Sequence, residues 1–127
     1  MAAVNLTAET FGTTIEGEGI VLVDFWAAWC GPCRMFAPIF EKAAVANPDI
    51  VFGKVDTEAE QELSGALGIR SIPTLMIFRD GILLFSQPGA LPGHVLDELI
   101  GKVRALDMDE VRTQIAAEEA AEAAAQR

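Results

Sequence analysis

Long apolar runs, separated by polar or glycine-rich turns, mark out the first three quarters of the chain. These runs predict strands at 4–6, 20–27 and 50–56. The second should be covered on both faces, because nearly all of it is apolar. Two further apolar runs flank Asp80-Gly81, a pair typical of a tight turn, and predict a β-hairpin over 74–87. The chain is therefore expected to contain a sheet with an antiparallel part at one end.

The segments between these strands carry apolar residues at helical spacing. Thr7 could cap a first helix, and Thr57 could cap a short helix that ends near Gly68. A longer helix should run over 30–46, and a last one should begin at Pro92. The resulting order, β-α-β-α-β-α-β-β-α, predicts a single α/β domain with a central mixed sheet and helices on both faces.

Residues 107–127 differ in composition from 1–106, which we take as one domain. Asp107 and Glu110 could form a capping box, and a short apolar stripe follows over 108–115. Beyond that stripe only Ala, Glu, Gln and Arg occur, and the whole extension carries 6 acidic and 2 basic residues. We expect an extra C-terminal helix, acidic and alanine-rich, that docks near its start and frays afterwards.

The overall charge of the 127-residue chain is strongly negative, with a formal net charge of −10. We therefore expect neither nucleic acid nor an anionic membrane as a partner. No apolar run approaches the roughly 20 residues of a transmembrane helix, and the start lacks the basic and apolar regions of a secretory signal. These features predict a cytoplasmic protein, and we expect a monomer.

The stretch DFWAAWCGPCRMF holds the only two cysteines, Cys30 and Cys33, at the expected start of a helix. Residues three apart lie on one face of a helix, within reach of a disulfide. The unpaired N–H groups and partial positive charge of a helix N-terminus favour a thiolate, whose pKa can fall from about 8.5 to roughly 7. The spacing therefore predicts that Cys30 is a nucleophile and that Cys33 resolves the mixed disulfide.

Two other interpretations of the cysteine pair are weaker. Zinc prefers about four ligands, and the sequence offers only the distant His94 beside the two cysteines. Inert cysteines would more often lie apart, without Gly31-Pro32 between them. That dipeptide also supplies no histidine to stabilise the thiolate further, which favours a reducing couple over an oxidising one.

Asp24 interrupts the apolar run that precedes the cysteines. A buried carboxyl would have a raised pKa and could accept the Cys33 proton and return it later. Spacing alone leaves a second interpretation equally open, in which Asp24 is exposed at the strand end or fully satisfied by hydrogen bonds.

Three segments resemble the thioredoxin family in order and spacing. They are VDFWAAWCGPCRMFAP, similar to the active-site signature, GIRSIPTLMIF, similar to the cis-proline segment, and PGALP, similar to a third substrate-facing loop. The resemblance covers roughly residues 4–104. It implies a thioredoxin fold and a bacterial-type dithiol–disulfide oxidoreductase with a redox-active disulfide and no bound cofactor.

The resemblance also implies roles for individual residues. Cys30 matches the attacking thiol, Cys33 the resolving thiol and Asp24 the buried acid, while Lys54 matches a lysine that modulates that acid. The remaining matched positions would form the substrate-binding surface: Trp29, Gly31, Pro32, Ile72, Pro73, Gly89 and Ala90.

The implied function is general reduction of protein disulfides. The implied partners are oxidised protein clients and a flavin-dependent thioredoxin reductase that supplies electrons from NADPH. Two alternatives stay open: an oxidase or isomerase of the same fold, and a binding or holdase module that does not use its thiols.

Overall fold

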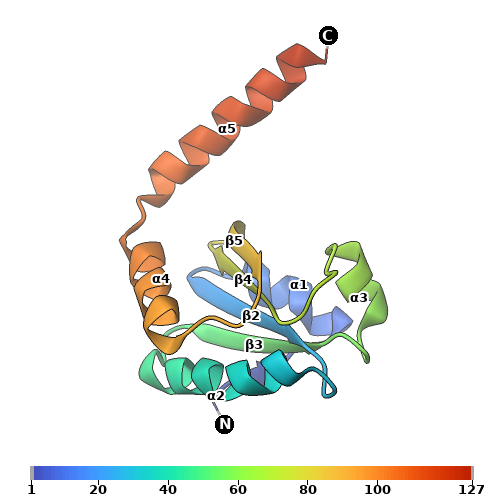
Figure 1. Cartoon of the computed structure of the whole chain (residues 1–127). Helices are drawn as coiled ribbons and strands as arrows, with labels where there is room; N and C mark the ends of the chain where they lie inside the picture. Colours follow the sequence, from blue (N-terminus) through green and yellow to red (C-terminus); the bar gives the residue numbers. More distant parts are fainter. Residues whose placement is uncertain (1, 127) are drawn as a thin grey trace.

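The computed structural model of the chain describes residues 2–126. Its centre is a five-stranded mixed sheet with the strand order β1-β3-β2-β4-β5 (Figure 1). The strands are β1 Val4–Asn5, β2 Ile20–Trp26, β3 Val51–Asp56, β4 Thr74–Arg79 and β5 Ile82–Pro88. β1 and β2 run parallel to β3, whereas β4 is antiparallel to both β2 and β5. The predicted mixed sheet is confirmed.

Helices cover both faces of this sheet. They are α1 Ala8–Glu16, α2 Gly31–Ala46, α3 Gln61–Ala66, α4 Gly93–Ala105 and α5 Met108–Ala125. Leu22 of β2 packs in a core with α2 and α4, while Val23 packs in a second core with Phe11 of α1 and residues of α3. Because side chains alternate along a strand, Asp24 falls on the same face as Leu22, under α2 and α4.

One predicted helix start is wrong. Thr57 does not cap α3, which begins four residues later with Glu60 at its N-cap. The N–H and the hydroxyl of Thr57 instead donate to the carbonyl oxygen of Trp26, at 2.9 and 3.0 Å. That carbonyl ends β2 and needs a donor, so the segment after β3 turns before it becomes helical. The end was predicted correctly, because Gly68 follows the helix with a φ of 72°.

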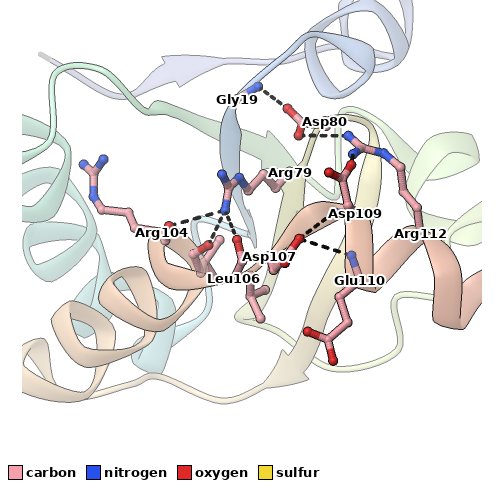
Figure 2. Close-up of polar contacts among 10 residues, drawn as sticks. Gly19, Arg79, Asp80, Arg104, Leu106, Asp107, Asp109, Glu110 and Arg112 are labelled. Atoms are coloured by element: carbon pink, nitrogen blue, oxygen red, sulfur yellow. Dashed lines mark hydrogen bonds and ion pairs between the residues drawn. The ribbon is translucent and has the colours of Figure 1, made fainter.

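The β4–β5 hairpin is confirmed in detail. Asp80 and Gly81 have φ values of 54° and 80°, the left-handed pair required by a type I′ turn. The Asp80 carboxylate also accepts a hydrogen bond from the Gly19 N–H at 2.8 Å (Figure 2). This contact joins the hairpin turn to the start of β2.

The C-terminal extension forms one continuous helix, α5, which leads away from the body of the molecule (Figure 1). Asp107 caps its start and Met108 is buried. Arg112 forms ion pairs with Asp80 and Asp109, both at 3.2 Å (Figure 2). Docking at the start agrees with the prediction, but the expected fraying does not appear, because alanine-rich sequence has high helix propensity. The helix remains regular to Ala125.

The junction between α4 and α5 is held by Arg79 at the end of β4. Its guanidinium donates to the carbonyl oxygens of Val103 at 2.9 Å, Leu106 at 3.0 Å and Arg104 at 3.4 Å (Figure 2). These carbonyls lie at the C-terminal end of α4, where the last carbonyl oxygens lack the usual helical donors, and only the Val103 oxygen also accepts a long hydrogen bond from the N–H of Leu106, at 3.4 Å.

Replacing Arg79 with Met should therefore lower the free energy of unfolding by about 1–2 kcal/mol, since a charged donor to several carbonyls is lost. Urea-induced unfolding followed by circular dichroism would measure it. Arg70→Met, at an exposed position, is the matched control. Equal stability of the two variants would show that Arg79 does not hold this junction.

None of the helices in residues 2–126 is both long and apolar enough to cross a membrane.

Candidate active site

The two cysteines meet at the first turn of α2. Cys30 is the N-cap residue, and a disulfide joins it to Cys33 with the two Cα atoms 5.2 Å apart. The N–H of Cys33 points at the Cys30 sulfur, 3.2 Å away. Pro32 lies in this first turn, where its missing N–H costs no helical hydrogen bond. In the reduced protein the same N–H and the helix N-terminus would stabilise a Cys30 thiolate.

The segment before β4 closes one side of the disulfide. The peptide bond between Ile72 and Pro73 is cis. The carbonyl oxygen of Ile72 lies 3.6 Å from the Cys30 sulfur. Pro73 is buried, and its carbonyl oxygen accepts a hydrogen bond from the N–H of Gly89 at 2.8 Å. The fold thus brings three distant segments to one place.

Most of the predicted client-facing residues lie at the surface around this disulfide. Trp29, Pro32, Gly89 and Ala90 are exposed, and Gly31 and Ile72 are partly exposed. Pro73 is the exception among the seven predicted substrate-binding residues, because its side chain is fully buried.

Trp29 has a partner that sequence analysis missed. Its side chain is 66% exposed, yet the indole N–H donates to the Glu58 carboxylate at 2.6 Å. Glu58 follows β3, and no motif in the sequence links it to a tryptophan 29 positions away. The contact arises because β2 and β3 are neighbours and their following loops lie side by side.

Asp24 is completely buried on β2, and neither of its carboxylate oxygens has a hydrogen-bond partner among the described residues. Burial raises the pKa of this carboxyl from 3.8 to about 7, and the Lys54 ammonium only partly opposes that shift. Of the interpretations that spacing left open, an aspartate exposed at the strand end is therefore wrong, and no described residue forms a hydrogen bond with the carboxylate. A carboxyl with a pKa near neutrality can both accept and donate a proton.

Lys54 lies beside Asp24 in the register of β2 and β3. Its ammonium is 5.0 Å from the centre of the Trp26 ring. A cavity of about 260 Å³ connects the disulfide with Lys54, since Cys33, Trp26 and Lys54 all line it. This arrangement gives Lys54 and solvent access to the side of the disulfide that faces the protein interior.

His94 lies apart from these residues, exposed at the start of α4. Within residues 2–126, no three His, Cys, Asp or Glu side chains are grouped to hold a metal ion.

The geometry at Cys30 and Cys33 suits one chemistry, which is exchange of their disulfide with external thiols and disulfides. It places the chain in the class of thiol–disulfide oxidoreductases.

Comparisons with known proteins identify the family. The thioredoxin family profile matches residues 2–102. A Streptomyces coelicolor protein designated thioredoxin 2 is 58% identical over 119 residues, which cover 94% of this chain and 89% of that protein. The thioredoxin of Bacillus subtilis is 41% identical over 103 residues, or 80% of this chain and 98% of that protein. The crystal structure of Malassezia sympodialis thioredoxin (Mala s 13) is similar with a TM-score of 0.70 and 31% identity, covering 78% of this chain and 89% of that chain. The chain belongs to the thioredoxin family.

Family membership defines Cys30 and Cys33 as a redox-active pair that carries electrons on its sulfurs, and thioredoxins bind no cofactor. The match to the Streptomyces protein takes in 119 of the 127 residues, so it extends into α5, beyond the end of the family profile.

Proposed function

We propose that the protein is a general protein-disulfide reductase whose reaction begins at Cys30. The Cys30 thiolate attacks one sulfur of a client disulfide, and the other client sulfur leaves as a thiolate. Cys33 then attacks the Cys30 sulfur, which releases the second client thiol and forms the Cys30–Cys33 disulfide. Two electrons pass from the dithiol to the client. The N–H of Cys33, directed at the Cys30 sulfur 3.2 Å away at a helix N-terminus, is the observation that carries this proposal.

Asp24 is proposed to take the proton that Cys33 must lose before it attacks. Support comes from its complete burial, its two unpartnered oxygens and a pKa of about 7. Lys54 is proposed to modulate this proton transfer, because its positive charge lowers the pKa of Asp24 and it lines the cavity at Cys33.

The surface around the disulfide is proposed to bind an extended client segment. Ile72 would pair with the client backbone next to the attacked sulfur. The exposed Trp29, with Gly31 and Pro32 beside it, would give an apolar contact that does not depend on client sequence. Gly89 and Ala90 would border the client on the other side. Pro73, being buried, would act by shaping this surface.

The proposed physiological setting follows the bacterial relatives. We infer that an NADPH-dependent flavoprotein, thioredoxin reductase, returns the Cys30–Cys33 disulfide to the dithiol, and that the protein works in the cytoplasm as a monomer. We also propose that residues 1–106 form the catalytic domain and 107–127 a helical extension to it.

A coupled enzyme assay with thioredoxin reductase tests this function directly. NADPH, a bacterial thioredoxin reductase and insulin are mixed with the protein, and NADPH consumption is followed at 340 nm. The proposal predicts catalytic consumption that needs all components. A folded protein that suppresses aggregation of an unfolded client but consumes no NADPH, with reductases from several bacteria, would favour the binding module instead.

The contact between Trp29 and Glu58 predicts an effect on client binding. Glu58→Ala removes the hydrogen bond that holds the exposed Trp29 indole, so more conformational entropy is lost when a client orders that side chain. The KM for insulin should therefore rise about threefold, with little change in kcat. Glu62→Ala, at an exposed position on α3, is the control. The same KM in both variants would show that Glu58 does not position Trp29.

A further inference from the structure

The short edge strand leaves an opening on the α2 face of the sheet. β1 has only two residues, and a cavity of about 500 Å³ lies between it, β3 and α2. This cavity shares Trp26, Ala37 and Lys54 with the smaller cavity at Cys33. The two cavities therefore lie next to each other, and both reach Lys54, the register neighbour of the buried Asp24.

Glu41 of α2 brings a negative charge to the wall of the larger cavity. Its carboxylate accepts hydrogen bonds from the N–H groups of Ala2 and Ala3, the latter at 3.1 Å. These two backbone donors, then the positive charge of the chain's N-terminal amino group and, last, the Lys54 ammonium hold the pKa of Glu41 below its ordinary value, against a raising effect of burial. Glu41 is therefore a fixed anion, anchored by the N-terminal segment.

The charge of Lys54 acts on two acids. Lys54 pairs in register with Asp24 on one side and with Asn5 of the edge strand on the other, and its charge lowers the pKa of both Asp24 and Glu41. Among the described residues, no ion pair within 4 Å locks Lys54 to either carboxylate. Its ammonium lies over the Trp26 ring instead, 5.0 Å from the ring centre, so its charge acts on both carboxylates without forming an ion pair with either.

Few other charges act on Asp24 from this side. Arg34 and Glu41 are the charged α2 residues that line the two cavities, and Lys54 is the one from β3. The residues that β4 and α4 contribute to the adjoining core are apolar. Glu41 is therefore the only acid that lines either cavity in the described part of the chain.

We propose that Glu41 is a positioning residue for proton transfer, which attracts the Lys54 ammonium away from Asp24 and so keeps the buried carboxyl easier to protonate. The inference rests on the proposed role of Asp24 as the base for Cys33. It assigns a purpose to the anchored N-terminal segment: Ala2 and Ala3 fix the carboxylate that competes for Lys54.

The experiment is a titration of Asp24 in the oxidised protein, followed by the carbon-13 signal of its carboxyl group. In Glu41→Gln the competing charge is gone, while an oxygen remains to accept a backbone N–H. Lys54 then acts more fully on Asp24, and the midpoint should fall by about 0.3 to 0.6 pH units, as expected for charges that do not touch. Glu9→Gln, an exposed acid on α1, should leave the midpoint unchanged. An unchanged or raised midpoint in Glu41→Gln would overturn the proposal.

A double variant tests whether the effect passes through Lys54. With Lys54→Met as background, Glu41→Gln should move the Asp24 midpoint by less than half as much. An undiminished shift would mean that Glu41 acts on Asp24 directly, and the positioning role would be wrong.

Failure of this inference can be told apart from failure of the proposed function. The titration reads Asp24 in the resting disulfide form, without turnover, whereas the role of Asp24 as base is read from the turnover of Asp24→Asn. Normal turnover in Asp24→Asn would show that Asp24 is not the base, but would leave the measured effect of Glu41 on its titration in place. An unchanged midpoint in Glu41→Gln together with slow turnover in Asp24→Asn would refute only the role of Glu41.

Discussion

Replacing Cys30 with Ser is expected to reduce NADPH consumption in the coupled insulin assay to less than about a thousandth of the wild-type rate. The thiolate is the attacking species, and a serine hydroxyl stays protonated at neutral pH. The helix N-terminus and the N–H of Cys33 would stabilise a sulfur anion at this position but cannot ionise an alcohol. The side chain is buried and nearly the same size, so the variant should fold and still dock clients.

Cys33→Ser is the matched control, because it should lose turnover for a different reason. Its Cys30 can still attack, but nothing resolves the mixed disulfide, so a covalent complex with insulin should accumulate on a non-reducing gel. Cys30→Ser should form no such complex. Accumulation in Cys30→Ser, or in both variants equally, would contradict the assignment of Cys30 as the attacking thiol.

Replacing Asp24 with Asn is expected to raise the free energy of unfolding of the oxidised protein by about 3–5 kcal/mol above pH 8. The folded carboxyl has a pKa of about 7, against 3.8 for its ordinary value, so between these values the folded state binds more protons than the unfolded state. Wild-type stability therefore falls as the pH rises through this window. Below about pH 4 both states hold the proton, and the cost of burying the charge disappears.

The stability advantage of Asp24→Asn over the wild type should thus grow progressively between pH 4 and pH 8. Urea unfolding of the two oxidised proteins across that range measures this difference. A difference that does not change with pH would show that Asp24 is not a buried carboxyl with a raised pKa.

The same carboxyl predicts the pH dependence of turnover. The wild-type resolution step should accelerate as the pH rises through about 7, because Asp24 must be ionised to accept the Cys33 proton, and Asp24→Asn should lose this acceleration. His94 is the only histidine, so His94→Gln serves as the control and should keep the wild-type profile. Loss of the acceleration in His94→Gln would show that His94, and not Asp24, causes the pH dependence of turnover.

The fold could be predicted largely because its signals are local. The β2 run is apolar on both faces and lies between two cores, and Asp80-Gly81 supplies the φ values that its turn requires. Cys30 and Cys33 are three residues apart on one helix, so their meeting needed no knowledge of distant contacts. At Thr57 the local pattern gave a wrong prediction. The Thr57 hydroxyl, which could have capped a helix, donates instead to the carbonyl oxygen of Trp26 on the neighbouring strand β2.

The electrostatics of the site could not be predicted in the same way, because they arise from register and tertiary packing. Burial of Asp24 depends on the face of β2 that α2 covers, and its approach to Lys54 depends on the pairing of β2 with β3. Glu58 and Glu41 reach Trp29 and the N-terminal segment across 29 and 39 positions, and neither acid stands in a motif. The long regular α5 also departs from expectation, because its alanines favour helix even where little of the protein contacts them.

The equilibrium reduction potential of the Cys30–Cys33 couple decides whether the two cysteines form a reducing dithiol. The protein would be equilibrated with dithiothreitol at a series of ratios of reduced to oxidised reagent, and the free thiols trapped and counted by mass. We predict a potential near −270 mV, as is typical of thioredoxins, since Gly31-Pro32 adds no charge to stabilise the Cys30 thiolate. A potential near −120 mV, typical of strongly oxidising dithiol proteins, would contradict a reductase and assign the site to disulfide formation.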